Sequence, residues 1–176
     1  DSDTIETLRP WLNLRYQLLP YNYTLAYQNS LTGMPLMRPL FFSAEQNPAL
    51  MDEKNSYLWG DAFLVAPVTE PGVTSWPVQL PGGVWFDYFN GNRFQGVRVV
   101  EIPVTLDTIP VLVKAGSFVP MAELVQSTRD YSSNKLTLHY YADPSVECAK
   151  GEMYEDDGKT PDAIANGQFE LLNFYY

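Results

Sequence analysis

Three consecutive carboxylates, Glu155, Asp156 and Asp157, form the densest group of side chains in this sequence that could do chemistry. Oxygen ligands of this kind suit a hard cation such as Ca²⁺. The same stretch, YEDDG, also fits a solvated β-turn, in which an aspartate accepts backbone hydrogen bonds and Gly158 takes a left-handed conformation. We favour the turn and keep a calcium-stabilised site at these three residues as the alternative.

Nucleophilic catalysis by a Ser-His-Asp triad and zinc chemistry both depend on His and Cys, and this chain has one of each. His139 is the only histidine, and it lies in the alternating segment LTLHYYA, where a lone histidine is more often structural than catalytic. Cys148 is the only cysteine, so neither an internal disulfide framework nor a zinc site with three protein ligands is expected. Neither of the common glycine-rich phosphate-binding motifs occurs. We therefore expect no cofactor.

The aromatic stretch LPGGVWFDYFNG, residues 80–91, admits two interpretations. Its rings either stack on sugars or pack a core. Along a strand, Trp85, Asp87 and Phe89 share one face, so one side of the strand can enter a core. We favour core packing. The alternative is a free-standing, non-catalytic carbohydrate-binding β-sandwich module that stacks sugars on Trp76 or Trp85.

Composition narrows the possible partners. The chain has 176 residues, of which 45% are hydrophobic and 18% charged, as in a folded domain. Its formal net charge of -10 disfavours binding to nucleic acid or to anionic lipid, whereas a neutral sugar meets no such penalty. We expect no membrane span, because no run of about eighteen apolar residues occurs. No signal peptide is visible and the first residue is Asp, which fits a piece of a longer protein whose location stays open.

The first thirty residues predict a helix with one buried face. Asp3 and Glu6 have the spacing of a capping box. Pro10 and Pro20 should each break or kink the helix, which should end between Ser30 and Gly33. The apolar positions that recur at steps of three and four are Ile5, Leu8, Leu12, Tyr16, Leu19 and Tyr23.

After Gly33 the pattern changes from helical to extended. Met34–Phe42 reads as a buried strand, and residues 47–54 as one or two helical turns. From Tyr57 onward, short runs rich in Val, Tyr and Phe alternate with Pro and Gly, which is typical of an antiparallel sandwich. Asn90–Asn92, with the letters NGN, predicts a hairpin turn.

The order of these segments resembles the C-terminal third of glycoside hydrolase family 31, which comprises α-glucosidases, α-xylosidases and relatives. The resemblance runs from about Leu12 to about Gly158. The residues that match the family's late barrel helix are Arg15, Tyr16, Leu19, Pro20, Tyr21 and Tyr23. Those that match its last barrel strand and its entry into a β-sandwich are Arg38, Pro39, Leu40, Gly60, Asp61 and the LVAPV run.

The resemblance implies a mainly β fold that follows the last helix and strand of a (β/α)8 barrel. Residues 1–56 would form the end of the catalytic barrel. Residues 57–134 would form a proximal antiparallel β-sandwich, and residues 135–176 the truncated beginning of a distal β-domain. The other partners would be the N-terminal and barrel portion of the same parent enzyme and its α-linked oligosaccharide substrate.

The resemblance also implies a retaining glycosidase that uses two aspartates, both upstream of Asp1. No catalytic residue is therefore expected in this chain, which alone should be inactive and should serve to close and stabilise the barrel. Arg38 lies near the end of the last strand and could approach the mouth of the site, although a structural ion pair inside the barrel is the favoured interpretation. Sugar specificity, linkage preference and oligomeric state are not predicted.

Overall fold

The computed structural model describes residues 2–176, which form two compact units that interleave along the chain. The helix unit contains the chain up to Met34 together with Phe118–Tyr140 and Cys148–Tyr176. The sheet unit contains Pro35–Ser117 and Tyr141–Glu147. The three domains predicted from the sequence, residues 1–56, 57–134 and 135–176, are continuous segments, unlike these two units. Their boundaries stay a prediction about the longer protein.

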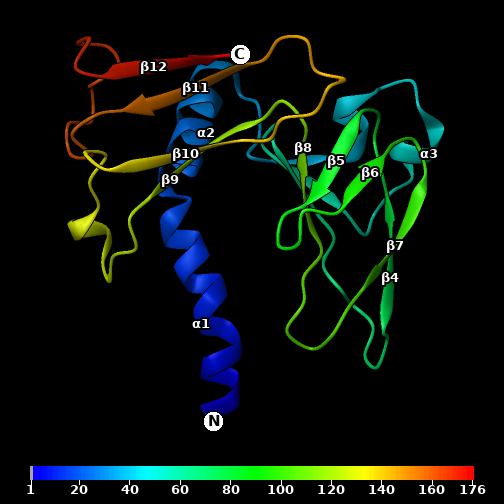
Figure 1. Cartoon of the computed structure of the whole chain (residues 1–176). Helices are drawn as coiled ribbons and strands as arrows, with labels where there is room; N and C mark the ends of the chain where they lie inside the picture. Colours follow the sequence, from blue (N-terminus) through cyan, green and yellow to red (C-terminus); the bar gives the residue numbers. More distant parts are fainter. Residues whose placement is uncertain (1) are drawn as a thin grey trace. The chain divides into compact units, whose positions relative to one another are not determined.

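The sheet unit is built from two antiparallel sheets (Figure 1). The larger sheet has the order β1-β2-β3-β8-β5-β6 and the smaller one pairs β4 with β7. The strands of the larger sheet are β1 (Met37–Pro39), β2 (Tyr57–Trp59), β3 (Phe63–Val65), β8 (Val111–Lys114), β5 (Val84–Asp87) and β6 (Arg93–Gln95). The smaller sheet contains β4 (Ser75–Gln79) and β7 (Val99–Pro103), and two short helices, η1 (Leu40–Ser43) and α3 (Pro48–Met51), follow β1.

The core of the sheet unit lies between its two sheets. On β4 the buried and exposed residues alternate, so Trp76 and Val78 point to one side. They join one apolar cluster with Trp85 and Leu112 of the larger sheet. Each such side chain contributes about 1.5–3 kcal/mol when it is fully buried. The predicted antiparallel sandwich is thus present in this unit.

The connection between β5 and β6 forms the hairpin that the NGN letters predict. Gly91 has φ 74°, which Asn or Gly tolerates. The Asp87 carboxylate accepts the N–H groups of Phe89 and Asn90 at 2.8 and 3.1 Å, and so fixes the turn. Because β5 ends at Asp87, the expected shared face stops there: Trp85 is 1% exposed, whereas Phe89 is 56% exposed.

The strand predicted for Met34–Phe42 is shorter than expected. Only Met37–Pro39 pairs, with β2, and a 3-10 turn follows at Leu40. Pro39 has no N–H to donate to a sheet, which favours the end of the strand there. The helical turn predicted for residues 47–54 is confirmed as α3, where the Asn47 side chain accepts the Ala49 N–H at 3.1 Å.

The helix unit consists of two helices and two strand pairs (Figure 1). The helices are α1 (Ser2–Gln17) and α2 (Leu19–Thr32). The strand pairs are β9 (Phe118–Ala122) with β10 (Leu136–Tyr140), and β11 (Lys150–Glu155) with β12 (Glu170–Tyr175); a short 3-10 helix, η2 (Thr128–Asp130), lies between β9 and β10.

The two helices correct part of the sequence prediction. Pro10 does not break α1, which continues through it from Ser2 to Gln17, and a kink at Pro10 stays a prediction. Asp3 lies inside α1 rather than capping it. The break near Pro20 is confirmed: α2 begins at Leu19, and Pro20 occupies its first turn, where the missing N–H costs nothing. Gly33, with φ 75°, ends α2 as predicted.

The buried face expected along the first helix is wrong for α1. None of its described residues is buried, and Ile5, Leu8 and Leu12 are 57%, 51% and 56% exposed. In α2 the buried apolar side chains include Tyr21 and Leu25. The periodicity therefore predicts the helix correctly. It also predicts that the apolar face of α1 is buried, and among the described residues nothing buries that face.

Candidate functional site

Arg38 forms an ion pair within the sheet unit. Its side chain is buried, its Nη1 donates to Oδ1 of Asp61 in the turn between β2 and β3, and its Nε donates to the carbonyl of Pro35 at 2.8 Å. Burying an arginine without such partners would be costly. The Asp61 side chain, by contrast, is 83% exposed. Arg38 therefore takes part in an ion pair of the sheet unit, whereas its place inside the barrel and its approach to substrate both stay predictions.

The acidic stretch after β11 is a turn. Gly158 has φ 63°, the left-handed conformation predicted for it. The Asp157 carboxylate accepts the N–H groups of Lys159 and Thr160 at 2.9 and 2.8 Å, and the Thr160 hydroxyl at 2.7 Å. The hydrogen bonds from Thr160 and Lys159 lower the pKa of Asp157 to about 2. The left-handed Gly158 and the backbone hydrogen bonds to an aspartate are confirmed, whereas Asp156 is engaged with Tyr23 and Tyr154 rather than solvated.

Asp156 faces helix α2 instead. It accepts the Tyr23 hydroxyl at 2.5 Å, the Tyr154 hydroxyl at 2.6 Å and the Gly158 N–H at 2.7 Å. Burial by itself raises the pKa of Asp156, but these three hydrogen bonds outweigh it, so the net pKa is lowered. Burial and then the bond to Asp156 raise the pKa of Tyr154 to about 12, and the same causes raise the pKa of Tyr23.

The backbone of β11 is tied to α2 at the same place. The Tyr154 N–H donates to Oγ1 of Thr24 at 3.0 Å, and the Thr24 hydroxyl donates to the carbonyl of Pro20 at 2.8 Å. The Tyr27 ring stacks on Tyr154 with 4.2 Å between centroids. We call Tyr23, Thr24, Tyr154 and Asp156 the tyrosine–aspartate clasp.

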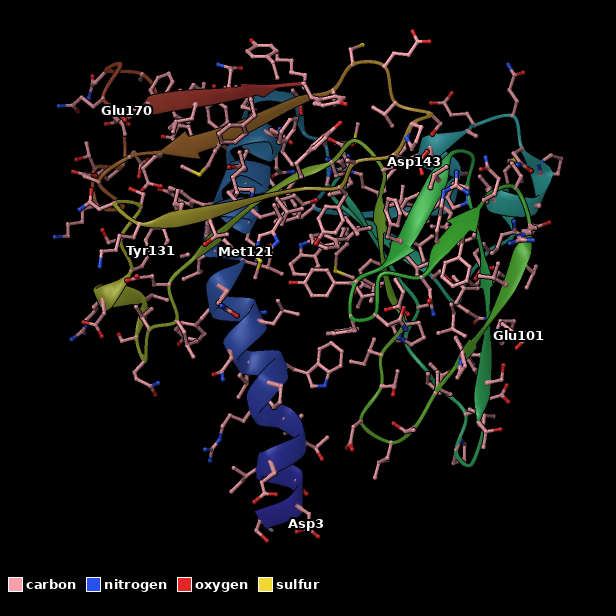
Figure 2. The ribbon with its side chains drawn as sticks, viewed as in Figure 1. Asp3, Glu101, Met121, Tyr131, Asp143 and Glu170 are labelled. Atoms are coloured by element: carbon pink, nitrogen blue, oxygen red, sulfur yellow. The ribbon has the colours of Figure 1, made fainter. Side chains whose placement is uncertain are left out.

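Glu155 points to a different partner from its two neighbours. Its Oε2 accepts the hydroxyl of Tyr131 at 3.1 Å (Figure 2 labels Tyr131). Burial raises the pKa of Glu155, although the hydrogen bonds from Tyr131 and Ser133 oppose that rise. The three adjacent carboxylates thus serve three sets of partners. Across residues 2–176, no group of three or more metal-binding side chains is placed to hold an ion, so the geometry gives the calcium hypothesis no support.

The clasp borders a hollow of about 350 Å³, which Lys159 and Thr160 also line. The hollow has no free carboxylate oxygen from Asp156 for acid–base catalysis, because both oxygens of Asp156 already accept hydrogen bonds. Tyr154 is 2% exposed, so its ring presents no free face for a sugar. What the clasp can do is hold the end of β11 against α2.

The residues proposed for sugar stacking lie in the core. Trp76 and Trp85 are 5% and 1% exposed, and Nε1 of Trp85 donates to the carbonyl of Pro81 at 3.3 Å. Core packing, the favoured interpretation of the aromatic stretch, is confirmed for Trp85, and Trp76, which precedes the stretch, is buried as well. The stacking module needs exposed rings at these positions and therefore loses its basis. His139 lies exposed on β10.

Some polar contacts join segments far apart in the chain, and two of them are examples that the sequence did not predict. One is the clasp, in which Tyr23 and Asp156 are 133 positions apart. The other is the ion pair between Arg93 and Asp143 in the sheet unit, with 2.7 Å between Nε and Oδ2. This bond and those from Ser145 lower the pKa of Asp143. No local spacing signals either contact, because each joins segments far apart in the chain.

Comparison with known proteins shows which family the sequence resembles. Residues 33–119 match the sequence model described as the glycosyl hydrolase family 31 C-terminal domain. Neutral alpha-glucosidase C of Macaca fascicularis is 37% identical over 171 residues, which are 96% of this chain and 22% of that protein. An alpha-xylosidase of Saccharolobus solfataricus is 33% identical over 157 residues, 88% of this chain and 21% of that protein.

A solved structure agrees with the sequence matches. The Flavobacterium johnsoniae GH31 dextranase complexed with glucose superimposes with a TM-score of 0.88 at 30% identity, covering 97% of this chain and 21% of that one. The chain belongs to glycoside hydrolase family 31 and carries its C-terminal domain. It spans about a fifth of the length of the curated relatives that it matches. Among the described residues, no helix is long and apolar enough to cross a membrane.

Proposed function

We propose that this chain is the C-terminal part of a retaining α-glycosidase, an α-glucosidase that hydrolyses the O-glycosidic bonds of α-linked glucosides. One observation carries the proposal: 37% identity to a neutral alpha-glucosidase extends over 96% of the chain. The substrate of the parent enzyme would be an α-linked oligosaccharide. The formal net charge of -10 fits a neutral ligand better than nucleic acid.

In the parent enzyme, residues 1–56 would end the (β/α)8 barrel, residues 57–134 would form the proximal sandwich, and residues 135–176 would begin the distal β-domain. The position of β1 does not add support for the barrel part of this arrangement. It lies at one edge of the six-stranded sheet and pairs antiparallel with β2, whereas the strands of such a barrel pair in parallel on both sides. The support comes from the match of residues 33–119 to the C-terminal domain of the family, which follows the barrel in this proposal.

The catalytic aspartates would come from the preceding part of the parent, as barrel enzymes assemble their sites from loops after several strands. This chain would close and stabilise the barrel, with Arg38 near its mouth, and would be inactive alone. Retaining glycosidases need two carboxyl groups about 5–5.5 Å apart across the scissile bond. The three acidic residues that follow one another in the sequence, Glu155 to Asp157, are already engaged in structural hydrogen bonds.

The test compares the parent enzyme with this chain on aryl α-glucosides and aryl α-xylosides. We expect the parent to release glucose with retention of the anomeric configuration, observed by NMR, and to prefer the glucoside. The isolated chain should hydrolyse neither. Preference for the xyloside would replace the proposed substrate, and activity of the isolated chain would overturn the assignment of the catalytic residues to the preceding part.

A further inference from the structure

Two Asn-Gly pairs occur in the sequence, Asn90–Gly91 and Asn166–Gly167. Such a pair can modify itself, because glycine has no side chain that keeps its backbone nitrogen away from the asparagine amide. The glycine nitrogen attacks Cγ of the asparagine, ammonia leaves and a five-membered succinimide remains. Water then opens the ring to aspartate or isoaspartate. Both pairs are exposed, so exposure does not distinguish them.

The first pair is held at each group that the reaction must move. The Asn90 N–H donates to the Asp87 carboxylate at 3.1 Å, and Oδ1 of Asn90 accepts the Asn92 N–H at 2.9 Å. The Gly91 N–H donates to the carbonyl of Asp87 at 2.9 Å. A nitrogen whose proton is held in a hydrogen bond has to release that bond before it can attack. The reaction at Asn90 therefore requires the hairpin to open.

The second pair lies in the turn between β11 and β12 and has fewer restraints. The Asn166 N–H donates to the carbonyl of Asp162 at 2.9 Å, and the Gly167 N–H donates to the carbonyl of Ile164 at 3.2 Å. Within residues 2–176, no hydrogen bond holds the side-chain amide of Asn166. Its Cγ is therefore free to turn toward the attacking nitrogen.

The two turns also differ in what their opening disrupts. The first turn continues β5, which pairs with β8 on one side and β6 on the other. Of residues 161–167 in the second turn, only Ala163 is buried. Segments with few buried apolar contacts open locally at low free energy. The second turn should therefore reach the reactive conformation more often than the first.

We propose that Asn166 is a site of spontaneous deamidation in the folded protein, whereas Asn90 is protected by its hairpin. A bond forms between the Gly167 nitrogen and Cγ of Asn166, and the bond from Cγ to Nδ2 breaks. The proton of the Gly167 N–H leaves with Nδ2 as ammonia, and water is the only co-reactant. The reaction accelerates as pH rises, because the attacking nitrogen must lose its proton. It does not depend on the proposed glycosidase activity.

The product changes the wall of the hollow beside α2. Either product adds a carboxylate to a chain whose formal net charge is already -10. Isoaspartate also inserts one methylene group into the main chain, inside the loop that the hydrogen bond from the Gln168 N–H to the Ala163 carbonyl closes at 2.8 Å. Ala163 and Ile164 line the hollow. Formation of isoaspartate should therefore loosen this wall and accelerate hydrogen exchange at Gln168.

Incubation of the parent enzyme in water enriched in oxygen-18 tests the proposal. The enzyme is kept folded in mildly alkaline buffer, then digested with trypsin in ordinary water and analysed by mass spectrometry. Cleavage after Lys159 releases a peptide that begins at Thr160 and contains Asn166 and Asn173. Asn173 precedes phenylalanine, so it reacts slowly and serves as an internal control. We expect Asn166 to gain heavy oxygen at least about tenfold faster than Asn90.

Two controls separate the effect of the fold from that of the sequence. In urea, Asn90 and Asn166 should react at similar rates, because both precede glycine. Asn166→Gln should remove the labelling at that position, since glutamine closes a larger ring more slowly, and should leave Asn90 unchanged. Equal rates at the two sites in the folded enzyme would overturn the proposal. So would labelling at Asn166 no faster than at Asn173, or a difference between the two Asn-Gly pairs that persists in urea.

Discussion

The sheet unit and the helix unit are each stabilised internally by a different kind of contact. In the sheet unit, buried rings and aliphatic side chains such as Trp85 and Leu112 fill the space between two sheets. In the helix unit, the clasp joins α2 to β11 through hydroxyl, carboxylate and backbone hydrogen bonds. An apolar core tolerates changes of pH and loses stability when volume is removed. A clasp built on a carboxylate depends on protonation and on single donors.

The largest effect is expected in the sandwich core. Trp85→Ala should lower the free energy of unfolding of the sheet unit by about 3–5 kcal/mol, because it removes a fully buried ring and leaves a cavity. Phe89→Ala, four positions along the same aromatic stretch, should cost under about 1 kcal/mol, since that ring is more than half exposed. Urea denaturation of both variants checks the contrast. Equal losses would remove the distinction between core and surface rings.

Removal of one hydroxyl oxygen from the clasp should lower the free energy of unfolding. Tyr23→Phe should cost about 1–2 kcal/mol, because it removes a hydrogen bond to a carboxylate without removing the ring. Tyr27→Phe is the matched control on the same helix and keeps the ring that stacks on Tyr154. A double-mutant cycle between Tyr23→Phe and Asp156→Asn, followed by denaturation, should give a clear coupling energy. Additive losses would mean that this contact does not stabilise the fold.

Acid should weaken the carboxylate contacts of both units, those of Asp156 and Asp157 in the helix unit and the Arg93–Asp143 pair in the sheet unit, but not the apolar sandwich core. The pKa values of Asp156 and Asp157 are lowered in the folded state, that of Asp157 to about 2. Their contribution to stability is therefore present above the unfolded pKa of about 3.9 and is lost as pH falls through the folded values. Glu155 opposes this trend, because its pKa is raised by burial and its protonation favours the folded state.

Melting temperatures measured from pH 6 down to pH 2 test this balance. Asp156→Asn should flatten the acid side of the profile, and Val100→Ala in the sandwich should lower the whole profile without changing its slope. An Asp156→Asn profile parallel to that of the wild type would show that the clasp carboxylate does not control the acid response.

The smallest effect is expected from removing divalent cations. Because Glu155, Asp156 and Asp157 serve separate partners, EDTA should leave the melting temperature of the chain unchanged. Differential scanning calorimetry with EDTA and with added calcium checks this. A rise in melting temperature with calcium would restore the metal site proposed from the sequence.

The same contrast explains what the sequence could predict. Period-two alternation and turn letters identify the sandwich, the NGN hairpin and the burial of Trp76 and Trp85, because a strand exposes its faces alternately. Helical periodicity located α1 and α2, yet it assigned Ile5, Leu8 and Leu12 to a buried face. Periodicity reports which face is apolar, and the protein that covers that face can lie outside the chain.

The candidate site was only partly predictable, for a related reason. The YEDDG letters predicted the turn and the conformation of Gly158, since those are local properties. The partners of Asp156 and Asp143 come from segments far away in the sequence. Neither spacing nor propensity encodes such contacts, and the resemblance to family 31 gives the fold without naming them.

The interleaving of the two units has a consequence for protein recombination. The chain passes from one unit to the other at 34/35, 117/118, 140/141 and 147/148. A chimera with a single crossover at 117/118 would therefore take β9 from one parent while α2, which shares its unit, came from the other. It would also separate Asp143 from Arg93. Exchange of one whole unit between relatives of this family requires that all of its segments move together.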